Sequence, residues 1–243
     1  MTDTTIAIGI FGSAGRMGQA LADAIPALGA RIAGCTDAGD DAAALAAIAD
    51  VLVDFSAPMA LSPHLSAARL ARTPILIGTT GLDGNHHAMI DEAASDIPVL
   101  QAANTSLGVN LLTAMVAQAA IRLGSEWDIE VLEMHHRHKV DAPSGTALLL
   151  GQAAANARGK SLPELTRFDR NDAREPGTIG FASLRGGSVV GDHTVIFASD
   201  GERIELGHRA DNRTVFAHGA VRAALWLAGQ PAGRYTMADM LGL

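Results

Sequence analysis

The sequence is short of several features that would each point to a class of protein. It has one cysteine, Cys35, and only 4% aromatic residues. A single cysteine cannot form an internal disulfide. No apolar run approaches the roughly 20 residues needed to span a bilayer, and the opening MTDTT lacks the basic and apolar parts of a signal peptide. We therefore expect a cytoplasmic protein without a membrane partner.

Basic clusters are also missing. The chain has 18 Lys and Arg against 26 Asp and Glu, a formal net charge of -8, and no run of basic residues. A protein that follows a phosphate backbone needs a basic surface. We therefore expect no nucleic-acid partner.

The first part of the chain has a regular rhythm. Short apolar runs alternate with alanine-rich segments of helical period, which predicts βαβ units and a parallel sheet. The runs lie at residues 5–11, 31–36, 51–55, 74–78 and 97–101, and the clearest helical segments at 17–28 and 60–72. The fold class predicted for residues 1–105 is an α/β, Rossmann-like dinucleotide-binding domain.

The pattern changes after residue 105. A long helix is predicted over 107–123, a strand over 127–134 and a helix over 147–157. Residues 178–209 alternate apolar and polar side chains, interrupted at 185–187 and 199–201 by turn signals that predict antiparallel strands joined by hairpins. We expect residues 106–213 to form a second, α+β domain with a mainly antiparallel sheet, which binds substrate and mediates oligomerisation. The apolar helix 214–227 and the rest of 214–243 are expected to pack back on the first domain.

A glycine-rich turn follows the first predicted strand directly. Its sequence is Gly12-Ser13-Ala14-Gly15-Arg16-Met17-Gly18. Glycines allow the backbone to approach a pyrophosphate, and the free N–H groups of the following helix start face the anion. The spacing is GxxGxxG rather than GxGxxG, so a purely structural turn remains the alternative.

Asp37 strengthens the dinucleotide interpretation. It follows the second predicted strand, where the acidic residue that binds the ribose is expected. A carboxylate accepts hydrogen bonds from a 2′-hydroxyl and repels a 2′-phosphate. NADH is therefore favoured, while the nearby cation of Arg16 leaves NADPH open.

The segment 133–147 carries the most chemistry. His135, His136, His138 and Lys139 lie within five positions and supply proton donors that work near neutral pH. Ser144 is placed to cap a helix whose first residues, Gly145 and Thr146, hold a carboxylate through their N–H groups. A small acidic substrate that is protonated as it reacts would suit this loop.

Two other interpretations of that loop are open. Its three histidines could bind zinc, but no cysteine or second cluster completes a site, so we expect no metal. The loop could also be a solvated basic segment. His86 and His87 follow the turn signal Asp83-Gly84-Asn85 and are predicted to be exposed without a functional role.

Segment 133–147 also matches the pattern E-x-H-H-x-x-K-x-D-A-P-S-G-T at every fixed position. On this basis the chain resembles the dihydrodipicolinate reductase family. Further matches are GRMG at 15–18, Asp54-Phe55-Ser56-x-Pro58, Gly78-Thr79-Thr80-Gly81, Asn104-x-Ser106-x-Gly108-Val109-Asn110 and Gly180-Phe181-Ala182. The resemblance extends over nearly the whole chain.

The resemblance implies an activity and a set of roles. The family reduces 4-hydroxy-tetrahydrodipicolinate to tetrahydrodipicolinate with NAD(P)H in lysine and diaminopimelate synthesis, and it is commonly tetrameric. The implied catalytic residues are His135 and Lys139, and the implied substrate-binding residues are His136, Ser144, Gly145 and Thr146. The implied cofactor-binding residues are Gly12, Ser13, Ala14, Gly15, Arg16, Met17, Gly78, Thr79, Thr80, Ala102, Ala103, Asn104 and Thr105, together with Asp37.

Two positions depart from the family. Relatives often have phenylalanine where this chain has Thr105, and many have arginine after the acidic ribose-binding residue, where this chain has Ala38. The second departure again favours NADH. Two other functions share the glycine turn: a different Rossmann-fold dehydrogenase, and an NAD(H)-sensing module without catalysis. The complete His-His-Lys loop argues against both.

Overall fold

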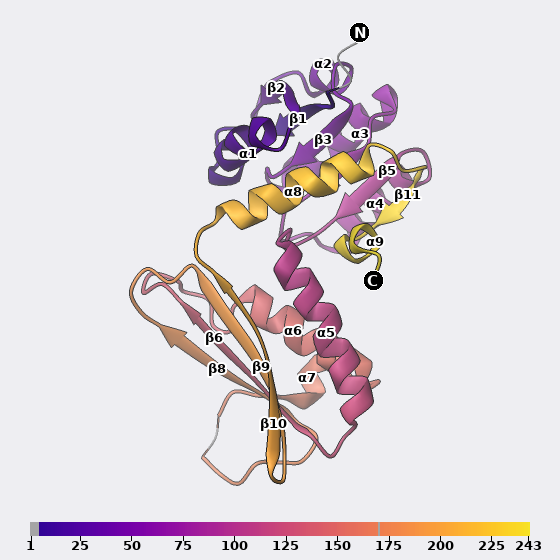
Figure 1. Cartoon of the computed structure of the whole chain (residues 1–243). Coiled ribbons are helices and arrows are strands. Elements are labelled where there is room, and N and C mark those ends of the chain that lie inside the picture. Colours follow the sequence, from indigo (N-terminus) through magenta and orange to yellow (C-terminus); the bar gives the residue numbers. More distant parts are fainter. Residues whose placement is uncertain (1–4, 170) are drawn as a thin grey trace. The chain divides into compact units, whose positions relative to one another are not determined.

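The computed structural model describes residues 5–169 and 171–243, which form two compact units. The first contains the chain up to Leu107 together with Thr214–Leu243, and the second contains Gly108–Arg213. Figure 1 shows the elements of both units.

A six-stranded sheet forms the centre of the first unit, with the strand order β11-β5-β4-β3-β1-β2 and every pair parallel. The strands are β1 (Ala7–Phe11), β2 (Arg31–Thr36), β3 (Val51–Asp54), β4 (Ile75–Ile77), β5 (Pro98–Gln101) and β11 (Gly233–Tyr235). The five predicted strands are confirmed. Parallel strands are covered on both faces, and this is why they are continuous apolar runs in the sequence.

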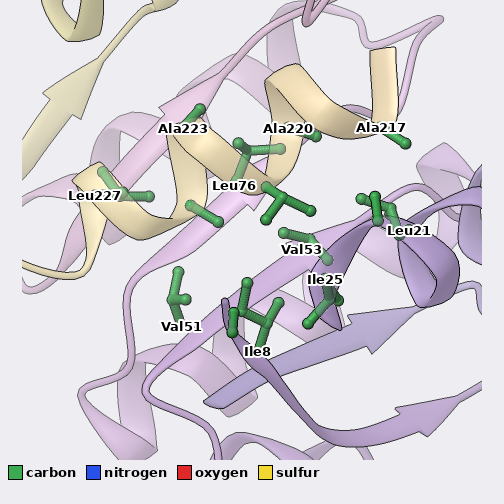
Figure 2. Packing of buried hydrophobic residues seen from close by; sticks show 14 of the residues in the cluster. Ile8, Leu21, Ile25, Val51, Val53, Leu76, Ala217, Ala220, Ala223 and Leu227 are labelled. Atoms are coloured by element: carbon green, nitrogen blue, oxygen red, sulfur yellow. The ribbon is translucent and has the colours of Figure 1, made fainter. Parts of the chain in front are cut away.

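Helices cover both faces of this sheet. They are α1 (Arg16–Ala27), α2 (Ala42–Ala46), α3 (Leu61–Ala71), α4 (Gly84–Ala94), α8 (Thr214–Leu227) and the short α9 (Met237–Leu241). One core cluster joins α1 and α8 to one face, and a second joins α2, α3 and α4 to the other. Figure 2 shows the small residues Ala217, Ala220 and Ala223 of α8 against Val53 and Leu76 of the sheet.

The sheet brings the predicted cofactor residues to one edge. The order of the strands reverses between β1 and β3, because β1 connects to β2 on one side and β3 leads to β4 on the other. In open parallel sheets, ligands bind at the carboxyl ends of the strands beside such a switch point. The glycine turn lies at this point.

The second unit is built on a five-stranded sheet in the order β10-β9-β6-β8-β7. Its strands are β6 (Asp128–His135), β7 (Thr166–Arg167), β8 (Ile179–Arg185), β9 (Gly191–Ser199) and β10 (Glu202–Ala210), and its helices are α5 (Leu107–Leu123), α6 (Gly145–Ala157) and α7 (Leu162–Leu165). These helices pack on one face of the sheet around Val116, Leu150, Val131 and Phe197. The predicted fold class is confirmed. The second sheet, predicted to be mainly antiparallel, is mixed: β10-β9 and β9-β6 pair antiparallel, and β6-β8 and β8-β7 pair parallel.

One of the two predicted hairpins is wrong. The turn at 199–201 does join the antiparallel strands β9 and β10. The turn at 185–187 does not join a hairpin, because β6 lies between β8 and β9 and pairs with β8 in parallel. The Gly-Gly turn shows where the chain reverses direction. It does not show which strands pair, and here β8 and β9 both pair with β6 instead of with each other.

The turn predicted at Asp83-Gly84-Asn85 is also wrong. Asp83 is the N-cap of α4. Its carboxylate accepts a hydrogen bond from the backbone N–H of His86 at 3.0 Å, and the backbone N–H of Asp83 donates to His86 Nδ1 at 3.1 Å. Asp and Asn favour both turns and helix starts, so the local signal was ambiguous. His86 serves this cap and is half-buried.

Candidate functional site

The glycine turn has backbone geometry that only glycine accommodates at two positions. Gly12 has φ +80°, and a Cβ there would lie 2.9 Å from the carbonyl oxygen of Phe55. A Cβ on Gly18 would lie 2.4 Å from the carbonyl oxygen of Gly12. The turn therefore packs against the end of β3 and the first turn of α1. No side chain caps α1, whose N-cap is Gly15.

Asp37 lies against this turn. Its carboxylate accepts hydrogen bonds from the Ser13 hydroxyl at 2.6 Å and from the Ala14 backbone N–H at 3.1 Å. These bonds, that of Ser13 first, lower the pKa of the exposed Asp37 carboxyl below its usual value. A fixed negative charge thus stands beside the glycine turn at the end of β2.

Asp54 is buried at the end of β3 and links three strand ends. It accepts hydrogen bonds from Ser56, at 2.9 Å from the backbone and 2.5 Å from the hydroxyl, and lies 3.2 Å from the Thr79 hydroxyl. Its other oxygen is 2.8 Å from His64 Nδ1. The His64 ring stacks on Phe11 at a centroid distance of 3.9 Å. The ends of β1, β3 and β4 are thereby held together.

A pocket of ≈ 170 Å³ lies beyond the ends of β4 and β5. It is lined by Thr79, Thr80, Gly81, Leu82, His87, Gln101 and Ala103. Three predicted cofactor residues, Thr79, Thr80 and Ala103, meet here. His87 was predicted to be exposed without a role, but it is half-buried, lines the pocket and lies 3.1 Å from Arg234 Nη2.

The other residues after β5 are arranged differently. Ala102 is part of the core beneath α8. The hydroxyl of Thr105 donates to the backbone carbonyl of Phe216 at 2.7 Å, and a Cβ on Gly219 would lie 1.8 Å from the carbonyl oxygen of Thr105. Thr105 therefore fastens this segment to α8, and Gly219 permits the close approach.

In the second unit, the buried face of β6 changes from apolar to polar along the strand. Ile129, Val131, Glu133 and His135 alternate on the covered face. In the sheet register, Glu133 lies opposite His193 of β9. The apolar core thus ends in a cluster of ionisable side chains at the carboxyl end of β6.

Glu133 is the centre of this cluster and is 1% exposed. Its carboxylate lies 2.6 Å from His135 Nδ1, accepts both arms of Arg185 at 2.8 Å each, and accepts the backbone N–H of Ser144 at 3.2 Å. Burial acts to raise the pKa of Glu133, but hydrogen bonds from Arg185, Ser183 and His135 outweigh it and lower the pKa to about 2. Glu133 is therefore an ionised buried carboxylate.

The start of α6 is joined to the same cluster. The Ser144 hydroxyl accepts from the backbone N–H of Ala147 at 3.2 Å, as predicted for an N-cap, and lies 3.0 Å from His193 Nε2. Burial, assisted by the charge of His135, lowers the pKa of His193 to about 4. His193 is thus neutral at pH 7. Gly145 is exposed and Thr146 half-buried in the first helical turn.

The loop between β6 and α6 carries further cations. The Lys139 ammonium lies 2.9 Å from the Asp141 carboxylate and is 21% exposed. Arg213 Nη2 lies 3.4 Å from His136 Nε2. Burial lowers the pKa of His136, and the positive charges of Arg213 and His138 lower it further. Lys139 and Arg213 are consequently the permanent cations near His136, and Asp141 offsets the charge of Lys139.

Sequence reasoning did not select Glu133, Arg185, His193 or Arg213 as site residues. Glu133 could have been found, since it lies two positions before His135 and faces the same way on a strand. The others reach the cluster from 49 to 77 residues away in the sequence. No local motif in the sequence predicts that they join this cluster.

A larger cavity of ≈ 460 Å³ elsewhere in the second unit contains none of the predicted site residues. It is lined by Arg158, whose guanidinium already donates to the backbone carbonyls of Gly124 at 2.7 Å and Trp127 at 2.6 Å. Within residues 5–169 and 171–243, no group of three or more His, Cys, Asp or Glu is arranged to hold a metal ion. None of the helices described combines the length and apolar character required to cross a membrane.

Comparison with known families matches both parts of the chain. Residues 6–105 match the family model for the N-terminus of dihydrodipicolinate reductase, and residues 108–241 match the model for its C-terminus. Among curated proteins, 4-hydroxy-tetrahydrodipicolinate reductase of Zymomonas mobilis subsp. mobilis is 55% identical and the alignment covers 99% of each chain. The enzyme of the same name from Acidiphilium cryptum is 49% identical over 100% of both chains.

Solved structures agree on the fold. A dipicolinate-bound dihydrodipicolinate reductase from Paenisporosarcina sp. TG-14 has a TM-score of 0.79 at 21% identity, covering 97% of this chain and 99% of its own. The WlbA dehydrogenase of Thermus thermophilus, in complex with NAD and UDP-GlcNAcA, has a TM-score of 0.54 at 12% identity, covering 95% of this chain and 97% of its own. Both likenesses concern the fold.

Proposed function

The chain belongs to the dihydrodipicolinate reductase family, and we propose that it reduces its substrate with NADH by means of His135 and Lys139. The activity of the family is that of 4-hydroxy-tetrahydrodipicolinate reductase, a nicotinamide-dependent oxidoreductase of lysine biosynthesis. The proposal concerns the residues that perform this reaction and the preferred cofactor. One observation carries it: His135, Lys139 and the capped start of α6 occur together at the carboxyl end of β6.

Recognition of a dicarboxylate is assigned to the start of α6 and the cations beside it. Gly145 and Thr146 follow the Ser144 cap, where the positive end of the helix favours an anion. Arg213 Nη2 lies 3.4 Å from His136 Nε2, so the guanidinium offers a positive charge and the imidazole offers a hydrogen bond for a carboxylate. A dicarboxylate, dipicolinate, is the ligand of the Paenisporosarcina relative.

The proton chemistry is assigned to His135 and Lys139. NADH, when bound, supplies the hydride. Hydride addition to a conjugated imine moves electron density to the ring nitrogen, so a proton donor must stand within hydrogen-bond reach. His135 binds Glu133 through Nδ1, which leaves Nε2 to carry the exchangeable proton. Gly191 keeps the space beside Nε2 open, because a Cβ there would lie 3.0 Å from it.

The glycine turn fits a dinucleotide. Gly12 and Gly18 leave no room for a Cβ, and the uncapped start of α1 supplies backbone donors for a pyrophosphate. The residues that would hold the cofactor are Gly12 to Met17, Asp37, Gly78 to Thr80 and Ala102 to Thr105. Asp37 presents a carboxylate suited to a 2′-hydroxyl, and this supports the preference for NADH.

A homotetramer completes the proposal. The face of the second sheet that the helices leave uncovered carries the apolar side chains of Leu132, Met134, Leu184 and Ile196, and Leu184 is 48% exposed. Symmetric association through this face would bury them. We place the enzyme in the cytoplasm, where the reduced cofactor is regenerated, and cell fractionation tests this.

The decisive experiment follows NADH and NADPH oxidation in parallel. Purified protein is given the freshly generated condensation product of pyruvate and aspartate semialdehyde. We expect rapid, substrate-dependent oxidation that is faster with NADH at equal concentration. Binding of NADH without turnover of this substrate would contradict the proposed reaction, and equal or faster use of NADPH would contradict the cofactor preference.

A further inference from the structure

Among the residues of the second unit that the structure describes, Glu133 is the one charged group that is almost completely buried and that no step of the proposed reaction uses. Its carboxylate receives four N–H groups, from the same strand, from β8 and from the start of α6. A buried carboxylate with this number of fixed donors is held rigidly. Its position therefore determines the position of what it holds.

We propose that Glu133 is the positioning residue for His135: paired with Arg185, it fixes the imidazole so that Nδ1 always carries hydrogen and Nε2 alone exchanges a proton. The inference rests on the proposed role of His135. It deepens that role by naming the group that sets the tautomer of the imidazole.

The tautomer follows from the chemistry of the contact. Glu133 is ionised, and an ionised carboxylate can only accept hydrogen bonds. At 2.6 Å, His135 Nδ1 must therefore be the donor, in the neutral ring as well as in the cation. The proton that His135 gives or takes is then on Nε2, the nitrogen beside Gly191.

Arg185 controls how strongly Glu133 acts on the imidazole. Its two arms bind both carboxylate oxygens at 2.8 Å each, so the negative charge is shared between His135 and a permanent cation. This sharing also keeps the proton of His135 from passing to Glu133. Arg185 therefore keeps Glu133 ionised and in place beside the ring.

The other charged and titratable groups near His135 are of both signs. His193 of β9 contacts its ring edge-on at a centroid distance of 5.0 Å and is neutral at pH 7. Lys139 and His136 lie on the adjoining loop, and Lys139 is paired with the carboxylate of Asp141. On β9, Asp192 lies opposite Met134 in the sheet register. Among these groups, Glu133 is the anion bonded to the ring itself, at 2.6 Å.

This arrangement makes two substitutions act differently. Glu133→Gln keeps the shape but removes the ionised acceptor, and an amide can donate as well as accept, so the ring of His135 should become a mixture of its two tautomers. Arg185→Gln leaves the carboxylate that accepts from Nδ1, so Nδ1 should stay protonated. Loss of a merely structural ion pair would disturb the ring in the same way in both variants.

The test is histidine ¹⁵N NMR of the full chain at mildly alkaline pH, where a neutral imidazole shows its tautomer, with the His135 signals assigned by their loss in His135→Asn. The wild type and Arg185→Gln should show hydrogen on Nδ1 alone, and Glu133→Gln should show both tautomers. Glu130→Gln is the matched control, because Glu130 is on the opposite face of the same strand and binds Arg174 at 3.1 Å. It should leave the tautomer of His135 unchanged.

A His135 ring that keeps hydrogen on Nδ1 alone in Glu133→Gln, or that loses this tautomer in both variants, would overturn the proposal. If Glu133→Gln does not fold, the wild-type spectrum decides, since hydrogen on Nε2 instead of Nδ1 would overturn the proposal. Activity provides a second readout: kcat should fall at least tenfold in Glu133→Gln, with KM for NADH unchanged. Because the NMR result needs no turnover, failure of the reductase assay would contradict the proposed function and leave this inference standing.

Discussion

Each unit contains a buried carboxylate bound to a histidine at the carboxyl end of a strand, but the two pairs are built differently. Asp54 lies 2.8 Å from His64 Nδ1 in the first unit, and Glu133 lies 2.6 Å from His135 Nδ1 in the second. The remaining donors to Asp54 are hydroxyl and amide groups, whereas Glu133 is also clasped by Arg185. A buried carboxylate–imidazole pair therefore occurs once without and once with an arginine bound to the carboxylate.

The two imidazole rings also differ in what lies beside them. The His64 ring is covered by Phe11, with the planes only 6° apart. The His135 ring instead has Gly191 beside Nε2, where no side chain intrudes. Stacking fastens the His64 ring to β1, although the side chain is 14% exposed against 10% for His135. The space at Gly191 leaves Nε2 of His135 room to meet a ligand. We therefore propose that the Asp54 pair fixes strand ends of the cofactor site and that the Glu133 pair supplies the nitrogen that exchanges a proton.

The distinction between the two carboxylate–histidine pairs is tested most directly by removing each imidazole in turn. His135→Asn should lower kcat by about 10²- to 10⁴-fold, the usual contribution of a general acid or base. His64→Asn should change kcat far less and act mainly on cofactor affinity, because it loosens the ends of β1 and β3. Steady-state kinetics together with NADH titration by fluorescence measure both. A loss of kcat as large in His64→Asn as in His135→Asn would abolish the distinction.

A second prediction separates chemistry from cofactor binding within the reductase. Lys139→Ala should reduce turnover by about 10²-fold or more, while NADH binding stays within a factor of two or three, since Lys139 lies on the substrate loop of the second unit. Lys160→Ala, an exposed lysine after the end of α6, is the control and should behave as wild type. Equal loss of turnover and of NADH affinity in a folded Lys139→Ala protein would assign the lysine to another role.

The cofactor side is tested by a smaller effect. Asp37→Ala should weaken NADH binding about tenfold and NADPH binding less, because the removed carboxylate binds a 2′-hydroxyl but repels a 2′-phosphate. Removal also frees the Ser13 hydroxyl and the Ala14 amide, which Asp37 now occupies. Asp23→Ala, which removes an exposed carboxylate from α1, controls for a general change of charge. If the ratio of the two affinities is unchanged, Asp37 is not the residue that discriminates.

The two units also differ in how much of them could be predicted from the sequence. The first unit is encoded locally: each strand is an apolar run, each crossover helix has its own period, and the glycine turn lies between neighbouring elements. The pairing of the second sheet depends on contacts across the chain. For this reason the turn at 185–187 was located but its hairpin was wrong.

The same contrast applies to the sites. His135, Lys139 and Ser144 belong to one continuous motif and were predicted from it as site residues. Arg185 reaches Glu133 across 52 positions and His193 reaches Ser144 across 49, through a sheet register that no local pattern encodes. His87 was misjudged because Asp83 was interpreted as a turn residue rather than as a helix cap. Residues that position other side chains through long-range contacts are therefore harder to predict than residues that belong to one motif.

The smallest expected effect concerns stability against pH and compares His193 with Glu133. The pKa of His193 is lowered from 6.5 to about 4, so unfolding takes up a proton between these values and stability falls as pH decreases from 6.5 to 4. The pKa of Glu133 is lowered from 4.5 to about 2, so its contribution is present above pH 4.5 and is lost as pH falls to 2.

The two windows adjoin, and substitution separates them. His193→Gln should flatten the decline between pH 6.5 and 4, by at most about 3 kcal/mol since one pKa unit corresponds to about 1.4 kcal/mol, and should leave the decline below pH 4.5 intact. Urea unfolding followed by circular dichroism at pH 7, 5.5 and 4 measures the first window, with the exposed His218→Gln as control. If His193→Gln keeps the full wild-type slope there, His193 does not stay neutral in the folded protein, and the bond from Ser144 to its Nε2 would have to form to a charged ring instead.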